Sequence, residues 1–409
     1  MKRLIICALA LLTLAVACKK EEFQQAPYGE KVPFADTAKY DLKVLIGASA
    51  THKLFYAAWQ RSHADSVLHS RGIAGFTVLA PDDAAMRAAG YDEAAIAGAV
   101  VTDIDSLVLF HILGVKIDSM AVAPLNMSTG MNTVLTHATL KEYLLNVGSS
   151  VPGYKPLRFR QFLSINNGRL FLNGKDAGNA QPLQATNGTV WPINHVTKKP
   201  KEHIIDLLAR DPRFSIFYEL VRRTNEEWPI LSEYMYERGY FNPLYPGQYN
   251  EIGNDMFFAP TNEAFANAGF NTFDDLWALN ERSMPYFDWD WFEMRNNFVS
   301  DSLLAYHMLG RYYAPSGSWG PGRAMPAVLF GTDLKNDLLK DYAVNAREPY
   351  SNIPPFIIPL DFGSEGGQVT VKVKGADKPA AKIIEADIMT YEGPVHVVDH
   401  LLLSDKVQL

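Results

Sequence analysis

Two stretches in different halves of the chain carry the same order of apolar and polar positions. Residues 76–86 (FTVLAPDDAAM) and 255–265 (DMFFAPTNEAF) each place an apolar run before Ala-Pro and a polar residue directly after it. The apolar run predicts a buried strand. Pro81 and Pro260 predict its end, because proline has no N–H to donate to a neighbouring strand.

The residues after each proline predict a short helix with defined ends. Asp82 and Thr261 offer a side-chain oxygen that can cap the helix N-terminus. Gly90 and Gly269, each followed by an aromatic residue, are typical of a glycine that ends a helix. The repeated unit is therefore strand, proline, short helix, glycine.

The match between the two halves extends well beyond this unit. The distance between matched positions grows from 216 − 54 = 162 to 259 − 80 = 179, then to 307 − 111 = 196 and 393 − 188 = 205, so the order is kept. The matched pairs are Leu54-Phe55-Tyr56 with Ile216-Phe217-Tyr218, Phe110-His111 with Tyr306-His307, and residues 188–196 with 393–401. We infer a duplicated domain with insertions in the second copy.

At these residues the chain resembles the fasciclin (fasciclin-I-like, beta-Ig-h3) domain family. Residues 259–265 are similar to its Ala-Pro-Thr-Asn-x-Ala-Phe motif, and residues 393–403 to its last strand. The resemblance implies an α+β fold of two tandem domains, each a β-wedge or sandwich flanked by short helices. It assigns structural motif roles to Pro81, His111, Pro260, Thr261, Tyr306 and His307.

The first copy departs from the family pattern at three places. Asp82-Asp83 replaces Thr-Asn, Phe110 replaces the tyrosine, and Trp191-Pro192 is expected to interrupt the last strand. A role tied to the tyrosine hydroxyl is therefore not expected in the first domain.

The N-terminus reads as a processing segment. Lys2 and Arg3 precede an apolar run that is too short to span a bilayer and that ends in small residues before Cys18. This arrangement resembles a bacterial lipobox, which implies removal of residues 1–17 and lipid on Cys18. Ordinary secretion is the alternative. We expect a flexible tether at 18–37, domain 1 at 38–200, with an early helix over about 54–69, and domain 2 at 201–409.

The charged residues after Cys18 bear on where the protein is displayed. Lys20, Glu21 and Glu22 resemble the Lys-acid-acid signal that sends lipoproteins to the outer face of the outer membrane in some glycan-foraging bacteria. The alternative is a solvated start to the tether. Short Asp-Ser/Thr-apolar tripeptides resemble an O-glycosylation motif of such bacteria, or are helix caps; they begin at Asp36, Asp65, Asp105, Asp118 and Asp301.

Composition excludes several classes of partner and site. Without Lys2 and Arg3 the chain has 36 basic and 45 acidic residues, which argues against nucleic acid. Its two cysteines, Cys7 and Cys18, lie in the leader and at the lipidation position, so we expect no disulfide and no thiolate metal site. No motif for a metal, a cofactor or a catalytic triad is present, and we expect none of these.

The histidines have structural interpretations. His111 and His307 each follow a leucine by four residues on an apolar helical face, which predicts a buried, hydrogen-bonded side chain. His195 and His400 follow Asn194 and Asp399 in the last motif. Neighbouring strand residues point to opposite faces, so no Asp-His catalytic pair is expected there.

The second copy gains aromatic insertions, which are the candidate contact surface. Asp288-Trp289-Asp290-Trp291 interleaves rings with acids; this suits sugar recognition, a protein interface, or simple packing of residues 287, 289 and 291 into a core. The candidate partner- or ligand-binding residues are Trp228, Tyr245, Trp289, Trp291, Tyr312 and Trp319.

These observations predict a non-enzymatic, lipid-anchored binding protein on the outer membrane, facing the cell exterior. Its partners would be outer-membrane lipid through Cys18 and a surface protein complex or an extracellular protein or glycan. The resemblance suggests an accessory subunit of a SusC/SusD-like nutrient importer. A free-standing adhesin is the alternative, and a polysaccharide-cleaving enzyme is the third.

Overall fold

The computed structural model describes residues 38–72, 75–117, 126–144, 153–231, 256–290, 293–296, 298–309, 328–343 and 357–407. Lys39–Leu409 forms one compact unit. The predicted leader and the tether up to residue 37 lie outside the described residues. We call residues 38–200 repeat 1 and residues 201–409 repeat 2.

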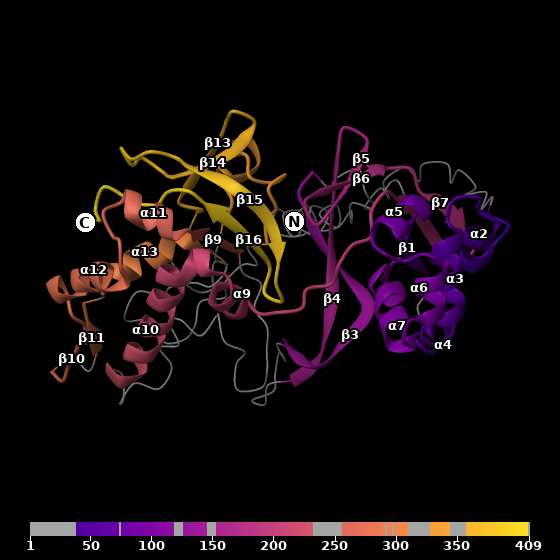
Figure 1. Ribbon diagram of the computed structural model, residues 1–409, viewed down its shortest axis with the longest axis horizontal. Coiled ribbons are helices and arrows are strands. Elements are labelled where there is room, and N and C mark those ends of the chain that lie inside the picture. The colour runs from indigo at the N-terminus through magenta and orange to yellow at the C-terminus, as the bar shows by residue number, and fades with distance from the viewer. Residues whose placement is uncertain are drawn as a thin grey trace, which may run out of the picture. The chain divides into compact units, whose positions relative to one another are not determined.

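Repeat 1 begins with helices, which gather around its first strand, and continues mainly as strands (Figure 1). Its elements are α2 (Leu42–Ala48), α3 (Lys53–Arg61), α4 (Ala64–Ser70), β1 (Phe76–Pro81), α5 (Asp83–Ala88), α6 (Glu93–Gly98), α7 (Val101–Phe110), β2 (Ile112–Leu113), β3 (Thr129–Leu144), β4 (Gly153–Asn166), β5 (Arg169–Leu172), β6 (Lys175–Asn179), β7 (Leu183–Ala185) and β8 (Gly188–Ile193).

Repeat 2 follows the same order with additions. Its elements are α9 (Ile204–Arg210), η1 (Pro212–Phe214), α10 (Ser215–Leu231), β9 (Met256–Pro260), α11 (Asn262–Asn267), α12 (Phe273–Trp277), η3 (Ala278–Arg282), β10 (Tyr286–Asp288), β11 (Glu293–Arg295), α13 (Val299–His307), β12 (Met308–Leu309), α14 (Asn336–Leu339), β13 (Leu360–Glu365), β14 (Gln368–Val373), β15 (Ala381–Met389) and β16 (Pro394–Val398).

The mixed α+β architecture has two main sheets and one small ribbon among the described residues. The strand orders are β6-β5-β4-β3-β2-β1-β8-β7 in repeat 1 and β12-β9-β16-β15-β14-β13 in repeat 2, with β10-β11 apart. β1 lies parallel to β8 and antiparallel to β2, as β9 does to β16 and β12. Ala80 pairs with Pro192 and Ala259 with Val397, so the duplication extends to the strand register.

The strand-proline-helix unit forms as predicted in both repeats. β1 ends at Pro81 and β9 at Pro260. The Asp82 side chain accepts from the Ala85 N–H at 2.7 Å, and the Thr261 hydroxyl accepts from the Ala264 N–H at 3.2 Å. These bonds satisfy N–H groups that the first turn of a helix leaves unpaired.

Each of these helices ends at its glycine in the left-handed conformation. Gly90 has φ 87° and Gly269 has φ 96°. The N–H of the aromatic residue that follows reaches back to the last turn, from Tyr91 to Met86 O at 2.9 Å and from Phe270 to Phe265 O at 2.9 Å. This is the Schellman arrangement, which needs a residue that tolerates positive φ.

The residue after the helix cap, Asp83 or Asn262, forms a hydrogen bond to the preceding helix and so links that helix to the strand-proline-helix unit. The Asp83 carboxylate accepts from the Leu54 N–H at 2.8 Å, and the Asn262 amide oxygen accepts from the Ile216 N–H at 3.1 Å. The change from Thr-Asn to Asp-Asp in repeat 1 therefore keeps both hydrogen-bond acceptors.

Two details differ from expectation. The early helix of repeat 1, expected over about 54–69, breaks at Ser62 because the Asp105 carboxylate accepts from the His63 N–H at 2.7 Å and starts a new helix, α4. Trp191-Pro192 does not interrupt β8, which runs from Gly188 to Ile193. Pro192 removes only its own N–H donor from the strand. The carbonyl of the next residue, Ile193, still accepts the Asp82 N–H at 3.0 Å.

A cap substitution tests the energetic role of the motif. Thr261→Val keeps the shape of the side chain but removes the oxygen acceptor, so we expect about 1 kcal/mol less stability in urea unfolding. Thr102→Val, on the exposed face of the first turn of α7, serves as control and should change stability by less than about 0.5 kcal/mol. Equal effects of the two variants would contradict the capping role.

Candidate functional site

The described part of the predicted aromatic surface lies on the β10–β11 ribbon. Trp289 is 62% exposed, and Tyr286 and Met284 beside it are 54% and 51% exposed. The Asp290 N–H donates to the Asp288 carboxylate at 3.0 Å, which shapes the turn where the ribbon reverses. Core packing is therefore wrong for Trp289, because most of its side chain is exposed in this surface turn.

The other candidate residues are not brought together by the described structure. The backbone at Trp228 belongs to α10, and its side chain lies outside the described residues. Tyr245, Trp291, Tyr312 and Trp319 also lie outside them, as do Cys18, Lys20, Glu21 and Glu22.

The two motif histidines occupy equivalent buried sites, as predicted. Nδ1 of His111 lies 2.8 Å from Leu107 O, and Nδ1 of His307 lies 2.8 Å from Leu303 O. Since a carbonyl only accepts, Nδ1 carries the proton and Nε2 is left as an acceptor. Nε2 then accepts a backbone N–H from the chain after the last strand, from Thr197 at 3.2 Å and from Leu402 at 3.1 Å.

Burial lowers the pKa of both His111 and His307 to about 4. Phe55 and Phe217 pack on these rings with centroids 5.9 and 6.0 Å away. Each neutral imidazole thus joins its helix and the core to the chain that follows the last strand. Tyr306 is half-buried against the core around β9 and β13–β15, whereas Phe110 at the corresponding position is buried.

The histidines that follow the last strands lie beyond the ends of those strands. β8 and β16 end before His195 and His400, so the alternation of a strand does not apply. Nδ1 of His400 lies 2.9 Å from the Asp399 carboxylate, and Nδ1 of His195 lies 2.9 Å from Asn194 Oδ1. Asp399 also accepts the Lys382 N–H at 2.7 Å, so it acts as a turn acceptor as well.

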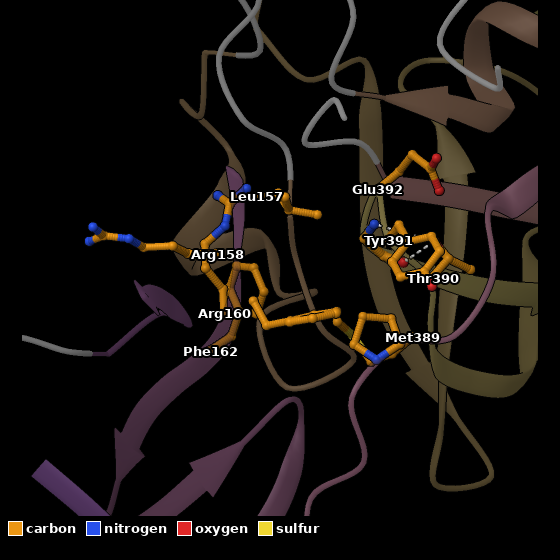
Figure 2. A pocket seen from close by; sticks show the side chains of 11 residues that line it. Leu157, Arg158, Arg160, Phe162, Met389, Thr390, Tyr391 and Glu392 are labelled. Atoms are coloured by element: carbon orange, nitrogen blue, oxygen red, sulfur yellow. Dashed lines mark hydrogen bonds between the residues drawn. The ribbon is translucent and has the colours of Figure 1, made fainter. Parts of the chain in front are cut away.

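A small pocket lies where β4 of repeat 1 meets the turn between β15 and β16. Its cavity volume is about 30 Å³, enough for one or two water molecules. Arg158 and Arg160 contribute to the lining, and Figure 2 shows both side chains leaving β4 on the side away from Thr390 and Tyr391. The pocket is therefore a packing gap between the repeats, too small for a sugar ring.

An aromatic and ionic cluster surrounds this pocket. The Tyr391 ring lies 4.9 Å from the ring of His203 and 5.3 Å from that of His137. Nδ1 of His203 lies 2.6 Å from the Glu392 carboxylate, which raises the pKa of His203. The second oxygen of Glu392 accepts the Ile204 N–H at 3.0 Å and so fixes the start of α9.

Further contacts between the repeats involve residues that the sequence did not single out. The rings of Phe162 and Phe330 lie 5.2 Å apart. The Ser128 N–H donates to the buried Asp333 carboxylate at 2.9 Å. Asn173-Gly174, with φ 49° and 80°, is a two-residue hairpin turn that its sequence could have predicted, although its contact with repeat 2 could not.

The described ranges contain neither a membrane-spanning helix nor a cluster of metal-binding side chains. There, no helix is long and apolar enough to cross a membrane. The same residues contain no group of three or more histidine, cysteine, aspartate or glutamate side chains placed to hold a metal ion.

Comparison with known proteins gives a likeness to solved structures. No family model matches the chain, and no curated protein matches it. Among solved structures, the chain is similar to a FAS1 domain pair from the insect cell adhesion molecule fasciclin I. The identity is 15%, over 87% of this chain and 97% of that chain, with a TM-score of 0.32. At these values the likeness fixes neither family nor function.

The buried histidines make stability depend on pH. A histidine with a lowered folded pKa stabilises the fold above its unfolded value near 6.5, and this stability is lost as pH falls toward about 4. We expect His307→Gln to reduce the pH slope of the unfolding free energy by up to about 1.4 kcal/mol per pH unit between pH 6.5 and 4.5. Urea unfolding across this range measures it.

His69→Gln is the matched control, since the His69 side chain in the last turn of α4 is exposed. Its slope should equal that of the unmodified chain. A slope for His307→Gln that also equals it would show that His307 is not held neutral.

Proposed function

We propose that this chain is a non-enzymatic cell-surface binding protein that contacts its partner through the β10–β11 ribbon of repeat 2. The supporting observation is the exposure of three large apolar side chains, Met284, Tyr286 and Trp289, on one short segment. Methionine, tyrosine and tryptophan are enriched in protein interfaces, and a cluster of them in solvent is otherwise costly.

The ribbon belongs to the second insertion, which repeat 1 lacks. The distance between matched positions increases by 196 − 179 = 17 residues across it. A scaffold that is duplicated down to its register does not need this addition for folding, and added surface segments more often carry function. The fasciclin-like resemblance, with its β-wedge or sandwich domains, supports a role in adhesion or matrix association.

The N-terminal signals supply the location in this proposal. Lipid on Cys18 anchors the chain to the outer membrane, and Lys20, Glu21 and Glu22 direct it to the cell exterior. A tether over residues 18–37 then gives both repeats access to surface partners. The partner is the transporter complex of a SusC/SusD-like importer, with an accessory role for this chain; a free-standing adhesin is the alternative.

Removing the exposed rings tests the surface. In a mild-detergent pull-down of the tagged lipoprotein from its own outer membrane, we expect Tyr286→Ala with Trp289→Ala to lower partner recovery at least tenfold, since such residues dominate interface energies. Tyr40→Ala is the control, because Tyr40 is 56% exposed in repeat 1.

The identity of the recovered protein separates the alternatives. A transporter with its lid lipoprotein supports the accessory role. Recovery of the chain alone, with surface display and a loss of attachment on gene deletion, supports the adhesin. Undiminished partner recovery by the double variant rules out the ribbon as the contact surface.

A further inference from the structure

The contact between the repeats contains a buried carboxylate in an unusual setting. Asp387 lies in β15 where the register with β16 shifts, and its φ of 63° is in the left-handed region. Its side chain is only 10% exposed. A non-glycine residue held in this conformation and buried at a contact calls for a functional explanation.

Repeat 2 supplies one hydrogen bond to this carboxylate. Oδ1 accepts the Gly331 N–H at 2.8 Å. The His396 side chain is fully buried beside it, with Nδ1 3.8 Å from the same oxygen. Nε2 of His396 lies 3.0 Å from Leu329 O and so carries the proton, which leaves Nδ1 to accept the Asp387 N–H at 3.4 Å. His396 is thus neutral and offers Asp387 no counter-charge.

Repeat 1 covers the other side of the Asp387 carboxylate. Gly174, in the turn between β5 and β6, approaches so closely that a Cβ there would overlap Oδ2 of Asp387. Lys175 is the nearby cation and partly offsets the burial. Burial, with a contribution from the Asp387 charge, raises the pKa of Asp333. Docking of repeat 1 therefore removes water from a carboxylate without pairing it fully.

We propose that the protonation state of Asp387 controls how tightly the two repeats associate. They associate more tightly when its carboxyl is protonated and more loosely when it is ionised, and we call this arrangement the Asp387 clamp. The apolar contact of Phe162 with Phe330 and the Ser128–Asp333 hydrogen bond remain in both states and keep the repeats joined. The clamp is independent of the partner surface on the β10–β11 ribbon.

The direction in which docking of the repeats changes with pH follows from the coupling between docking and proton binding. Burial raises the pKa of Asp387 to about 6. A neutral carboxyl is favoured in the docked state, so docking takes up a proton between the ordinary pKa and about 6; docking therefore weakens as pH rises across this interval and levels off above about 6. The docking equilibrium changes by at most about a hundredfold, tenfold per pKa unit. His396, whose pKa burial lowers to about 4, stays neutral across this range.

Distances between the repeats test the clamp. In the full chain with C7S and C18S, cysteines in place of the exposed Ser66 in α4 and Ser302 in α13 carry a donor and an acceptor dye. We expect a single narrow distance distribution at pH 5 and a broader one at pH 7.5, with little further change above about pH 6. Far-UV circular dichroism should not change.

Asp387→Asn is the decisive variant, because asparagine tolerates the left-handed conformation and carries no charge at any pH. It should keep the narrow distribution at both pH values. Asp341→Asn, at a side chain 87% exposed, should respond as the unmodified chain does. A wild-type pH response in Asp387→Asn, an unmodified chain without a response, or a response of opposite sign would each overturn the clamp.

Discussion

The parallel pairing of the first and last strands is the constraint on which each repeat depends. Phe76 pairs with Gly188 in repeat 1 and Phe257 with Val395 in repeat 2, so strands more than a hundred residues apart in sequence must meet first-to-last. Such long closures lose much chain entropy, and local propensity cannot offset it. The hydrogen bonds around this strand pair therefore determine that the first and last strands, and no others among those described, pair in parallel.

These contacts explain why the motifs of each repeat occur together. The residue before the last-motif glycine binds the first helix: Asn187 accepts the Leu42 N–H at 2.9 Å, and Glu392 accepts the Ile204 N–H at 3.0 Å. The buried histidine binds the chain just after the last strand. Glu392, His111 and His307 are buried, so losing one of these acceptors leaves a buried N–H without a partner, at a cost of roughly 1–3 kcal/mol. The motifs therefore act together to hold the first and last strands of each repeat in contact.

The local part of this scheme could be predicted from sequence. Pro81, the Asp82 cap, the terminating Gly90 and the buried His111 all follow from the chemistry of single residues and their immediate neighbours. The duplication also follows, because its offsets preserve order. The break of the early helix could not be predicted, since Asp105, forty-two residues away, caps the second half. The exposure of Trp289 was equally hidden, because Asp-Trp-Asp-Trp fits a strand, a turn or an interface.

The contact between the repeats is the least predictable feature, and for a physical reason. Positions that close each repeat are constrained to be alike in both copies: Asn187 and Glu392 differ in type yet both accept a hydrogen bond. The contact uses positions where the copies differ. Tyr391 corresponds to Thr186, and Asp387 corresponds to Pro182, which has neither charge nor a donor N–H. In a head-to-tail pair the two copies contribute different parts of the repeat to the contact, so these positions can differ between the copies without disturbing the closure of either repeat. Sequence differences between the two copies, at equivalent positions of the same strand register, therefore determine how the repeats are arranged and how that arrangement is controlled.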